Sequence, residues 1–207
     1  MSVPRDWPGE TVVILATGPS LTQADVDFCR GKARVIAINN AYTVAPWADA
    51  LYGTDAQWWG WHKGVPSFKG PKWALNHSQW GRTRALYPDI QLLMNTGPDG
   101  LEHKPTGLKN GRNSGYAAIN LAVHYGAKRI VLLGYDMQPH GKKTHFFGDH
   151  PNKSASPYAA FRKRMYSLVK PLKKIDVEVI NCSRKSALQA FPMGRLEDVL
   201  SGKAVAA

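Results

Sequence analysis

Apolar residues in this chain fall into short continuous runs, each closed by a polar, glycine-containing turn. The run at 130–133 ends in a Gly-Tyr-Asp turn at 134–136, and a helical pattern at 114–125 precedes it. The run at 11–16 ends in the same way, in a Thr-Gly-Pro-Ser turn at 17–20. A strand that is covered by helices on both faces of a parallel sheet is apolar throughout. Both runs therefore predict buried parallel strands.

The same alternation extends over most of the chain. We expect strands at 11–16, 34–39, 50–54, 73–75, 90–94, 129–135 and 177–181, and helices at 21–30, 114–125 and from Pro157 onward. Strands that alternate with helices predict an α/β fold, here a Rossmann-like, doubly wound and mostly parallel sheet. The 207 residues are expected to form a single domain. Residues 55–80 and 95–113 look irregular, and 137–156 is expected to form a partly irregular lid.

Cysteine content and hydropathy narrow the class of protein. Cys29 and Cys182 are too few for a disulfide scaffold or a zinc site, and they predict inert thiols in a reducing compartment. No apolar run approaches the ~20 residues that span a bilayer. The first residues lack the apolar segment of a secretory signal. We therefore expect a cytoplasmic protein without a membrane span.

The charge of the chain is strongly basic and unevenly distributed. The net charge is +12, and residues 137–174 contain nine Lys or Arg against Asp149 alone. Such a block favours a polyanionic partner, although a basic surface that serves only solubility has the same composition. Six of the seven tryptophans lie between positions 47 and 80, and aromatic rings stack on bases as well as on sugars. We predict an acceptor site formed by Trp58, Trp59, Lys142, Lys143, Arg162 and Lys163.

Polar residues gather where the predicted strands end, and the carboxyl ends of parallel strands form the ligand crevice of such sheets. Gly18 lets the backbone approach a ligand, and the helix that follows offers free N–H groups to a phosphate. Asparagine amides suit a nucleobase or sugar hydroxyls, yet the same residues also suit turns and helix caps. We predict donor contacts from Thr17, Gly18, Pro19, Ser20, Asn39, Asn40, Asp55, Asn113, Ser114, Gly115 and Asp136.

Three histidines follow the strand predicted at 129–135. His140, His145 and His150 lie in one loop, and Asp149 precedes the last of them. Their spacing is unspecific for zinc and no cysteine cluster accompanies them, so no metal is expected. Imidazole titrates near neutral pH and suits a general base. We predict His150 and His145 as catalytic residues.

Taken together, these motifs resemble those of the small bacterial sialyltransferases, which transfer sialic acid from CMP-sialic acid. The resemblance spans roughly residues 11–192 and rests on the order and spacing of the motifs, since identity is sparse. The motifs are Gly18-Pro19-Ser20-Leu21, Asn39, Ser114-Gly115, Gly134-Tyr135-Asp136, the segment 145–150, and Asn181-Cys182-Ser183 through Phe191. The archaeal pterin pyrophosphokinase-like proteins share the Gly-Pro-Ser turn and the Ser-Gly helix.

The resemblance implies roles for single residues. The positions that hold the cytidine nucleotide in the family correspond to Thr17, Gly18, Ser20 and Asn39, with Thr17 in place of the family's asparagine. Ser114 corresponds to the serine that touches the donor. His150 corresponds to the general base, although Gly148 lies one residue further from it than in the family pattern.

Two departures concern the leaving phosphate. The paired tyrosines of the family fall near Gln138 and His145, and its arginine is displaced by one position, to Arg112. Stabilisation of the leaving group then falls to His145, Tyr158 or Lys142, and the donor need not be CMP-sialic acid.

The resemblance and the charge together predict an inverting, metal-independent glycosyltransferase. It would transfer a sugar from a nucleotide-sugar, which the resemblance implies is CMP-linked, to a hydroxyl on hydroxylated DNA or on a phosphorylated surface glycan. Two other classes stay open. A pyrophosphoryl-transfer enzyme would require Mg²⁺, held by Asp55 or Asp136. A non-enzymatic nucleic-acid-binding protein on a Rossmann scaffold would tolerate the loss of His150.

Overall fold

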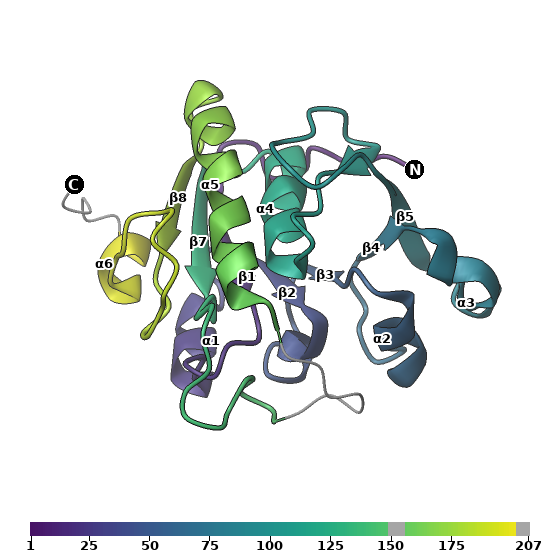
Figure 1. Ribbon diagram of the computed structural model, residues 1–207, viewed down its shortest axis with the longest axis horizontal. Helices are drawn as coiled ribbons and strands as arrows, with labels where there is room; N and C mark the ends of the chain where they lie inside the picture. Colours follow the sequence, from purple (N-terminus) through teal and green to yellow (C-terminus); the bar gives the residue numbers. More distant parts are fainter. Residues whose placement is uncertain (149–155, 202–207) are drawn as a thin grey trace.

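The chain folds around one eight-stranded sheet in which every strand is parallel to its neighbours. The computed structural model describes residues 1–148 and 156–201. Figure 1 shows it with two helices, labelled α4 and α5, in front of the sheet. The order across the sheet is β6-β5-β4-β3-β2-β1-β7-β8. The strands are β1 (Thr11–Leu15), β2 (Arg34–Ile38), β3 (Ala50–Tyr52), β4 (Lys72–Asn76), β5 (Ile90–Asn95), β6 (Gly107–Leu108), β7 (Arg129–Leu133) and β8 (Glu178–Asn181).

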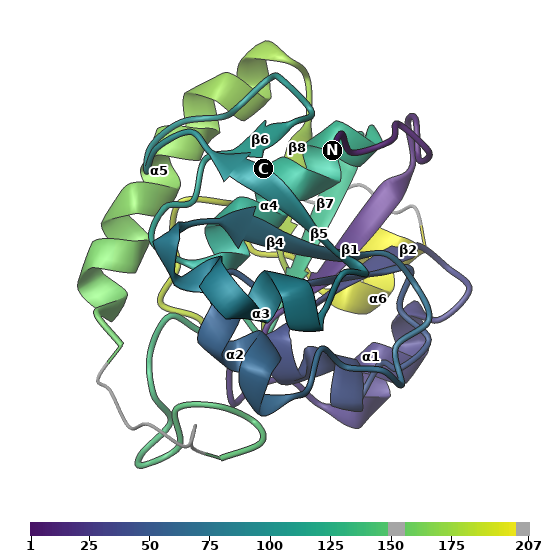
Figure 2. The ribbon, with the colours of Figure 1, turned by 90° about the vertical axis from the view of Figure 1, so that its right-hand side faces the viewer.

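Helices cover both faces of this sheet. On one face lie α4 (Ser114–Tyr125) and α5 (Tyr158–Lys174), and on the other lie α1 (Gln23–Cys29), α2 (Ala56–Trp61) and α6 (Leu196–Leu200) (Figures 1 and 2; Figure 2 shows the sheet from the side). The short α3 (Gly81–Leu86) follows β4. Alternate residues of one strand serve the two faces: Val12 and Ile14 pack with α4, whereas Val13 and Leu15 pack with α1. This is why the strands are apolar throughout.

The predicted α/β, Rossmann-like fold is confirmed. All seven expected strands form, with shifts of one or two residues at their ends, and the expected helices form as well. Four elements were missed: the two-residue β6 inside the expected loop at 95–113, and the short helices α2, α3 and α6. A five- or six-residue helix presents too few turns for an apolar period to be recognised. Of the expected lid, 137–148 is an irregular loop closed by a bridge between His140 and Lys143, and 149–155 lies outside the described residues.

The order of the strands places a reversal beside β1. From β1 the chain builds outward through β2 to β6, and it then returns to add β7 and β8 on the other side of β1. In open α/β sheets, ligands bind at the carboxyl ends of the strands where the order reverses. The turns that follow β1 and β7 therefore mark the candidate site. Within the described part of the chain, no helix is both long and apolar enough to cross a membrane.

Candidate functional site at the carboxyl edge of the sheet

The centre of the crevice is a contact between the turns that end β1 and β7. The Asp136 carboxylate accepts hydrogen bonds from Ser20 N (2.8 Å) and Ser20 Oγ (2.6 Å). His140 Nε2 lies 3.2 Å from Asp136 Oδ2, without the geometry of a hydrogen bond. Burial raises the pKa of Asp136, and the hydrogen bonds from Ser20 oppose this shift. The carboxylate, which is 1% exposed, therefore holds two turns together and has protein partners at both oxygens.

Glycines allow these two turns to touch. Gly18 N donates to Gly134 O over 2.9 Å. A Cβ on Gly18 would lie 2.3 Å from Asp136 Oδ1 and 2.4 Å from Gly134 O. Gly134 adopts a φ of 69°, which side-chain-bearing residues rarely adopt. We expected Gly18 to allow a ligand to approach the backbone. The structure corrects this, because the space beside Gly18 is filled by the backbone of the β7 turn.

The motif that begins at Asn181 supports the β7 turn from the side of β8. Tyr135 N donates to Ser183 Oγ (2.8 Å), Ser186 Oγ donates to Tyr135 O (2.6 Å), and Ala187 N donates to Asp136 O (2.8 Å). Three hydrogen bonds from the β8 side thus hold the backbone of this turn in place.

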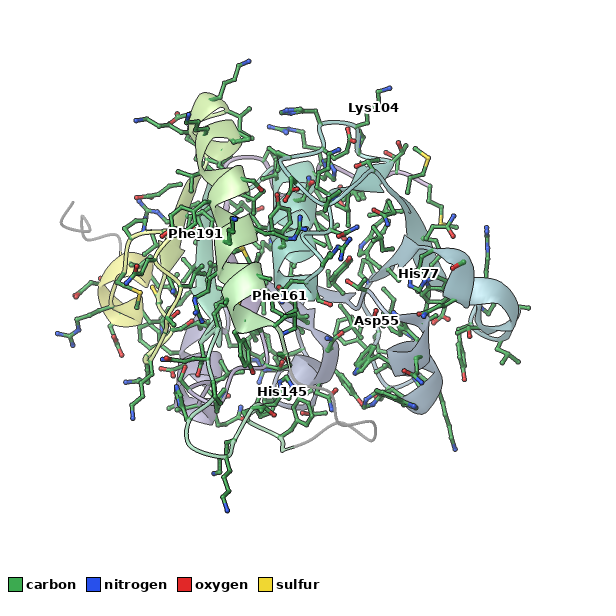
Figure 3. All side chains as sticks on the ribbon, viewed as in Figure 1. Asp55, His77, Lys104, His145, Phe161 and Phe191 are labelled. Atoms are coloured by element: carbon green, nitrogen blue, oxygen red, sulfur yellow. The ribbon has the colours of Figure 1, made fainter. Side chains whose placement is uncertain are left out.

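A small cavity of about 100 Å³ opens over the two turns. Its wall includes His145, whose Nδ1 lies 3.0 Å from Thr17 Oγ1. Phe146 N donates to Thr17 O (3.0 Å), so two hydrogen bonds join the histidine loop to the β1 turn. Tyr158, from the first turn of α5, lines the same cavity, and burial raises the pKa of its phenol. Figure 3 shows His145 next to the lower end of α5, near Phe161.

A larger cavity of about 420 Å³ adjoins the first, and Asn113 lines both. The N-terminus of α4 forms one wall: Asn113 is its N-cap and accepts from Tyr116 N, and Ser114 Oγ donates to Thr54 Oγ1 (3.0 Å). The first N–H groups of a helix have no acceptor within the helix and carry its positive dipole. Arg112 lies beside this end. The remaining lining is polar and includes Asp55, His77, Ser78, Gln79, Asn95 and Asn110.

The two asparagines that follow β2 have different roles. Asn40 Oδ1 accepts from Trp58 Nε1 (2.7 Å) and is engaged in the fold. Asn39 Oδ1 is buried and has no hydrogen-bond partner among the described residues. A buried acceptor of this kind is expected to receive a donor from water or a ligand. Asn39, Arg112 and Met137 all have a positive φ (48°, 55° and 51°), so left-handed backbone gathers at this edge of the sheet.

Two parts of the predicted acceptor site are wrong. Trp58 and Trp59 are 3% and 0% exposed and pack in the core between α2 and the sheet, so neither ring is available for stacking. The sequence did not predict α2, the short helix that packs both rings into the core. Arg162 donates to Met137 O (2.7 Å) and thereby fixes the start of the histidine loop. Lys142, Lys143 and Lys163 are exposed, and their contact with an acceptor stays a prediction.

The other predicted residues are distributed as follows. Asp55 is exposed and stands before α2, at the larger cavity, whereas Asp136 lies at the small one. His150 lies outside the described residues. The remaining predicted contacts, Pro19 and Gly115, belong to the β1 turn and the first turn of α4; a Cβ on Gly115 would lie 2.7 Å from Tyr135 Cε1. In residues 1–148 and 156–201 no group of three or more His, Cys, Asp or Glu side chains could hold a metal ion.

Sequence reasoning missed His77, Asn95 and Asn110, which line the larger cavity. His77 and Asn95 stand at the ends of β4 and β5, so the strand-end rule that selected Asn39 and Asp55 would have found them. Asn110 had no such signal, because β6 was hidden in the expected loop. The two thiols are inert as predicted: burial raises the pKa of both Cys29 and Cys182 to about 12.

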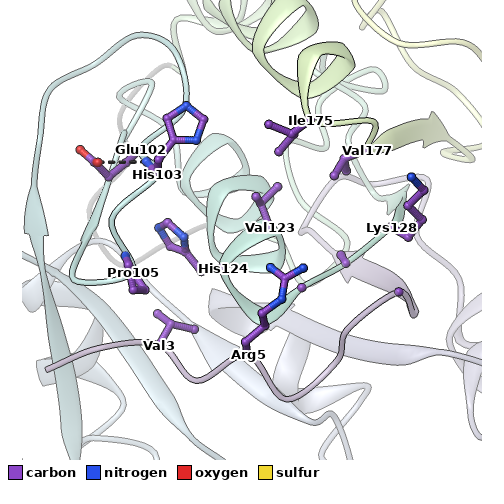
Figure 4. Close-up of a pocket in the computed structure, with 13 residues that line it drawn as sticks. Val3, Arg5, Glu102, His103, Pro105, Val123, His124, Lys128, Ile175 and Val177 are labelled. Atoms are coloured by element: carbon purple, nitrogen blue, oxygen red, sulfur yellow. Dashed lines mark hydrogen bonds between the residues drawn. The ribbon is translucent and has the colours of Figure 1, made fainter.

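Another cavity lies at the opposite, amino edge of the sheet. It measures about 520 Å³ and is lined by the N-terminal segment, the loop at 102–105 and the C-terminal end of α4 (Figure 4). Arg5 and Val123 point into it, and His124 on its wall is held by Gly107 O (2.9 Å). The helix end here presents carbonyl groups, which disfavour a phosphate. The carboxyl edge is therefore the better candidate for a phosphorylated ligand.

Comparison of the chain with protein-family models, with curated proteins and with solved structures finds no match. Fold and site alone define its class. It is a Rossmann-like α/β protein with a preformed, polar crevice at the point where the strand order reverses.

The contact of Gly18 with the β7 turn is tested by adding one methyl group. We expect Gly18→Ala to reduce the free energy of unfolding by about 1–3 kcal/mol, because the new Cβ overlaps backbone that cannot move away. Gly60→Ala is the control: the site faces open space in α2, and the change should be neutral or stabilise by up to ~1 kcal/mol. Urea unfolding measures both. Equal stability of the two variants would contradict the assigned contact.

Proposed function

We propose that the protein is a nucleotide-sugar-dependent glycosyltransferase that acts without a metal ion. One observation carries the proposal: Asn113 joins a cavity with the features of a phosphate site to a second cavity that contains a histidine held by hydrogen bonds. A transferase needs these two functions side by side, one to bind the donor and one to activate the acceptor. The earlier resemblance to small sialyltransferases agrees with this arrangement.

The larger cavity suits the nucleotide part of the donor. Its volume of about 420 Å³ falls in the range of roughly 300–1,000 Å³ that small-molecule sites occupy. The N–H groups of Ser114 and Gly115 stand at the positive end of the 12-residue α4, and Arg112 adds a full positive charge. These groups favour a diphosphate or monophosphate. The amides of Asn95 and Asn110 offer donors and acceptors for sugar hydroxyls or a base.

The small cavity suits the reacting hydroxyl. Thr17 Oγ1 fixes His145 Nδ1, in the way that a triad carboxylate orients its histidine. In the proposed step the acceptor oxygen attacks the anomeric carbon and its proton passes to the imidazole. The bond from that carbon to the phosphate breaks, and the nucleotide leaves with the electron pair. Negative charge grows on the phosphate, where Arg112, the α4 amides and the Tyr158 hydroxyl would stabilise it.

The choice of base rests between two histidines. His145 is the residue at the described cavity, and His150 is the residue that the family resemblance favours. We assign the base to His145 on geometric grounds and keep His150 as the alternative within the same mechanism.

A Mg²⁺-dependent pyrophosphoryl transfer is the second candidate. It requires free carboxylate oxygens near the phosphates, and Asp136 already accepts two hydrogen bonds from Ser20. Asp55, exposed at the larger cavity, is the carboxylate better placed for a metal. The glycosyltransferase proposal is favoured because α4 and Arg112 supply positive charge without one.

Donor binding predicts which ligand raises the melting temperature. In a thermal-shift panel of CMP-, UDP-, GDP- and dTDP-sugars with ATP, we expect one nucleotide-sugar to stabilise the protein, by ~2.7 kcal/mol at 100 times its Kd. Arg112→Gln should weaken that ligand about tenfold or more, because it removes a charge-assisted contact. Arg30→Gln removes the same charge from the far end of α1 and should leave binding unchanged. If ATP alone raises the melting temperature, pyrophosphoryl transfer is favoured over glycosyl transfer.

Turnover predicts which histidine is the base. We expect His145→Ala to lower kcat by roughly 10²–10⁴-fold with little change in donor affinity, since a base acts mainly in the transition state. His103→Ala, an exposed histidine at the amino edge, is the control. If only His150→Ala lowers kcat, the general base is His150 and not His145. Full activity in both His145→Ala and His150→Ala would refute the mechanism.

Metal removal separates the two enzyme classes. We expect activity to survive EDTA, because positive protein groups stabilise the leaving phosphate in the proposed mechanism. Loss of activity that Mg²⁺ restores would instead support pyrophosphoryl transfer. Asp55→Asn would then abolish the activity that Mg²⁺ restores. Asp89→Asn, which changes an exposed carboxylate distant from the cavity, would leave that activity intact.

A further inference from the structure

The outer face of α5 carries a row of exposed lysines. Lys163, Lys170, Lys173 and Lys174 are exposed and, with Tyr166, follow helical spacing on one side of α5. No acidic residue occurs anywhere between Tyr158 and Lys174. Within residues 1–148 and 156–201, none of these four ammonium groups forms an ion pair or a hydrogen bond with the protein. We call these five residues the α5 stripe.

The basic residues of α5 that do have partners lie off the stripe. Arg164 binds both oxygens of Asp99 (2.8 and 3.0 Å), and Arg162 donates to Met137 O. The structure thus divides the basic block seen in the sequence into two kinds of residue. The arginines hold loops onto α5. The ammonium groups of the stripe form no ion pair or hydrogen bond within the described residues.

We propose that the α5 stripe binds the phosphate backbone of a single-stranded nucleic acid and that this strand is the acceptor. The acceptor role rests on the proposed function, whereas the binding itself does not. From Lys163 to Lys174 the helix rises about 16 Å, enough to follow several phosphates. The aromatic ring of Tyr166 is 53% exposed among the lysines, and a ring beside cations is the usual platform for an unpaired base.

A lipid surface fits α5 less well. Helices that lie on membranes insert an apolar face into the lipid. The apolar face of α5 is already occupied, because Met165, Leu168 and Leu172 are at most 2% exposed and pack against the sheet. Only the charged face is left, and it suits a polymer with regularly spaced phosphates.

The position of α5 connects the stripe to the crevice. The first turn of α5 contributes Tyr158 and Phe161 to the wall of the small cavity, beside His145. Lys163 follows within one turn of the helix. In Figure 1, α5 runs from the crevice at the carboxyl edge to the opposite edge of the sheet. A strand bound along the stripe therefore passes the mouth of the cavity, where one of its hydroxyls can reach the histidine.

The test is the salt dependence of binding, measured without any donor. Fluorescence anisotropy of a labelled 20-nucleotide single-stranded DNA is recorded over a KCl series. Four phosphate contacts contribute a slope of about −3 to the plot of log K against log salt, at ~0.7 per contact for single strands. We expect the quadruple Lys→Gln variant at 163, 170, 173 and 174 to lose most of that slope. Tyr166→Ala should weaken binding about tenfold with the slope unchanged.

A matched variant controls for net charge. Lys→Gln at 32, 63, 69 and 185 removes the same charge from exposed sites elsewhere, and it should keep the wild-type slope. Equal losses in the two quadruple variants would overturn the stripe in favour of diffuse attraction. The proposal would also be overturned if the wild-type protein bound vesicles that contain anionic lipid but not DNA, or if it bound no DNA at all.

Binding and catalysis fail separately in this design. If a strand whose bases carry hydroxyl groups binds through the stripe but no sugar is transferred to it from any donor, the proposed function fails and the stripe stands. If a small hydroxyl acceptor is glycosylated by wild type and by the stripe variant alike while DNA is not bound, the stripe fails and the transferase stands. Unchanged thermal unfolding of the quadruple variant confirms that the fold is intact.

Discussion

The buried carboxylate of Asp136 is the contact on which the site depends. It joins the turn after β1 to the turn after β7 through two hydrogen bonds from Ser20. A carboxylate with 1% exposure is costly unless such donors meet it. Because the two turns touch, Gly18 and Gly134 cannot carry side chains without displacing backbone. The same contact sets the floor of the small cavity and the position of Thr17, which holds His145.

Secondary contacts extend this arrangement around the edge of the sheet. Ser183 and Ser186 bind the backbone of Tyr135, and the Tyr135 hydroxyl donates to Gly115 O (2.9 Å) at the start of α4. The N-terminus of α4 and the turn that carries Asp136 are therefore linked through one buried tyrosine. Ser114 continues the chain of contacts to Thr54 after β3. Elements far apart in sequence thus form one rigid rim, which is the condition for a preorganised site.

The sequence predicted the class of fold because buried parallel strands leave an unambiguous apolar signature. Strand ends also located Thr17 and Asp136 at the crevice, since carboxyl ends of parallel strands meet at one edge, and the predicted start of a helix located Ser114 there. Burial was not readable: Trp58 and Trp59 lie inside a core that only the assembled layers define. Nor could charge pattern separate Arg162, which binds a carbonyl, from Lys163, which faces solvent. Such distinctions arise from long-range contacts that no local period records.

The order of the strands has a consequence for how the protein folds. β1 is the first strand of this sheet in chain order, yet it lies between β2 and β7, and Ser20 and Asp136 are 116 positions apart. Closing so large a loop is slow, because its entropy is lost before any contact compensates for it. The strands from β1 to β6 can associate in sequence, but one edge of β1 stays open until β7 arrives. The crevice is thus among the last features to form, and a chain that has acquired it has already completed the rest of its sheet.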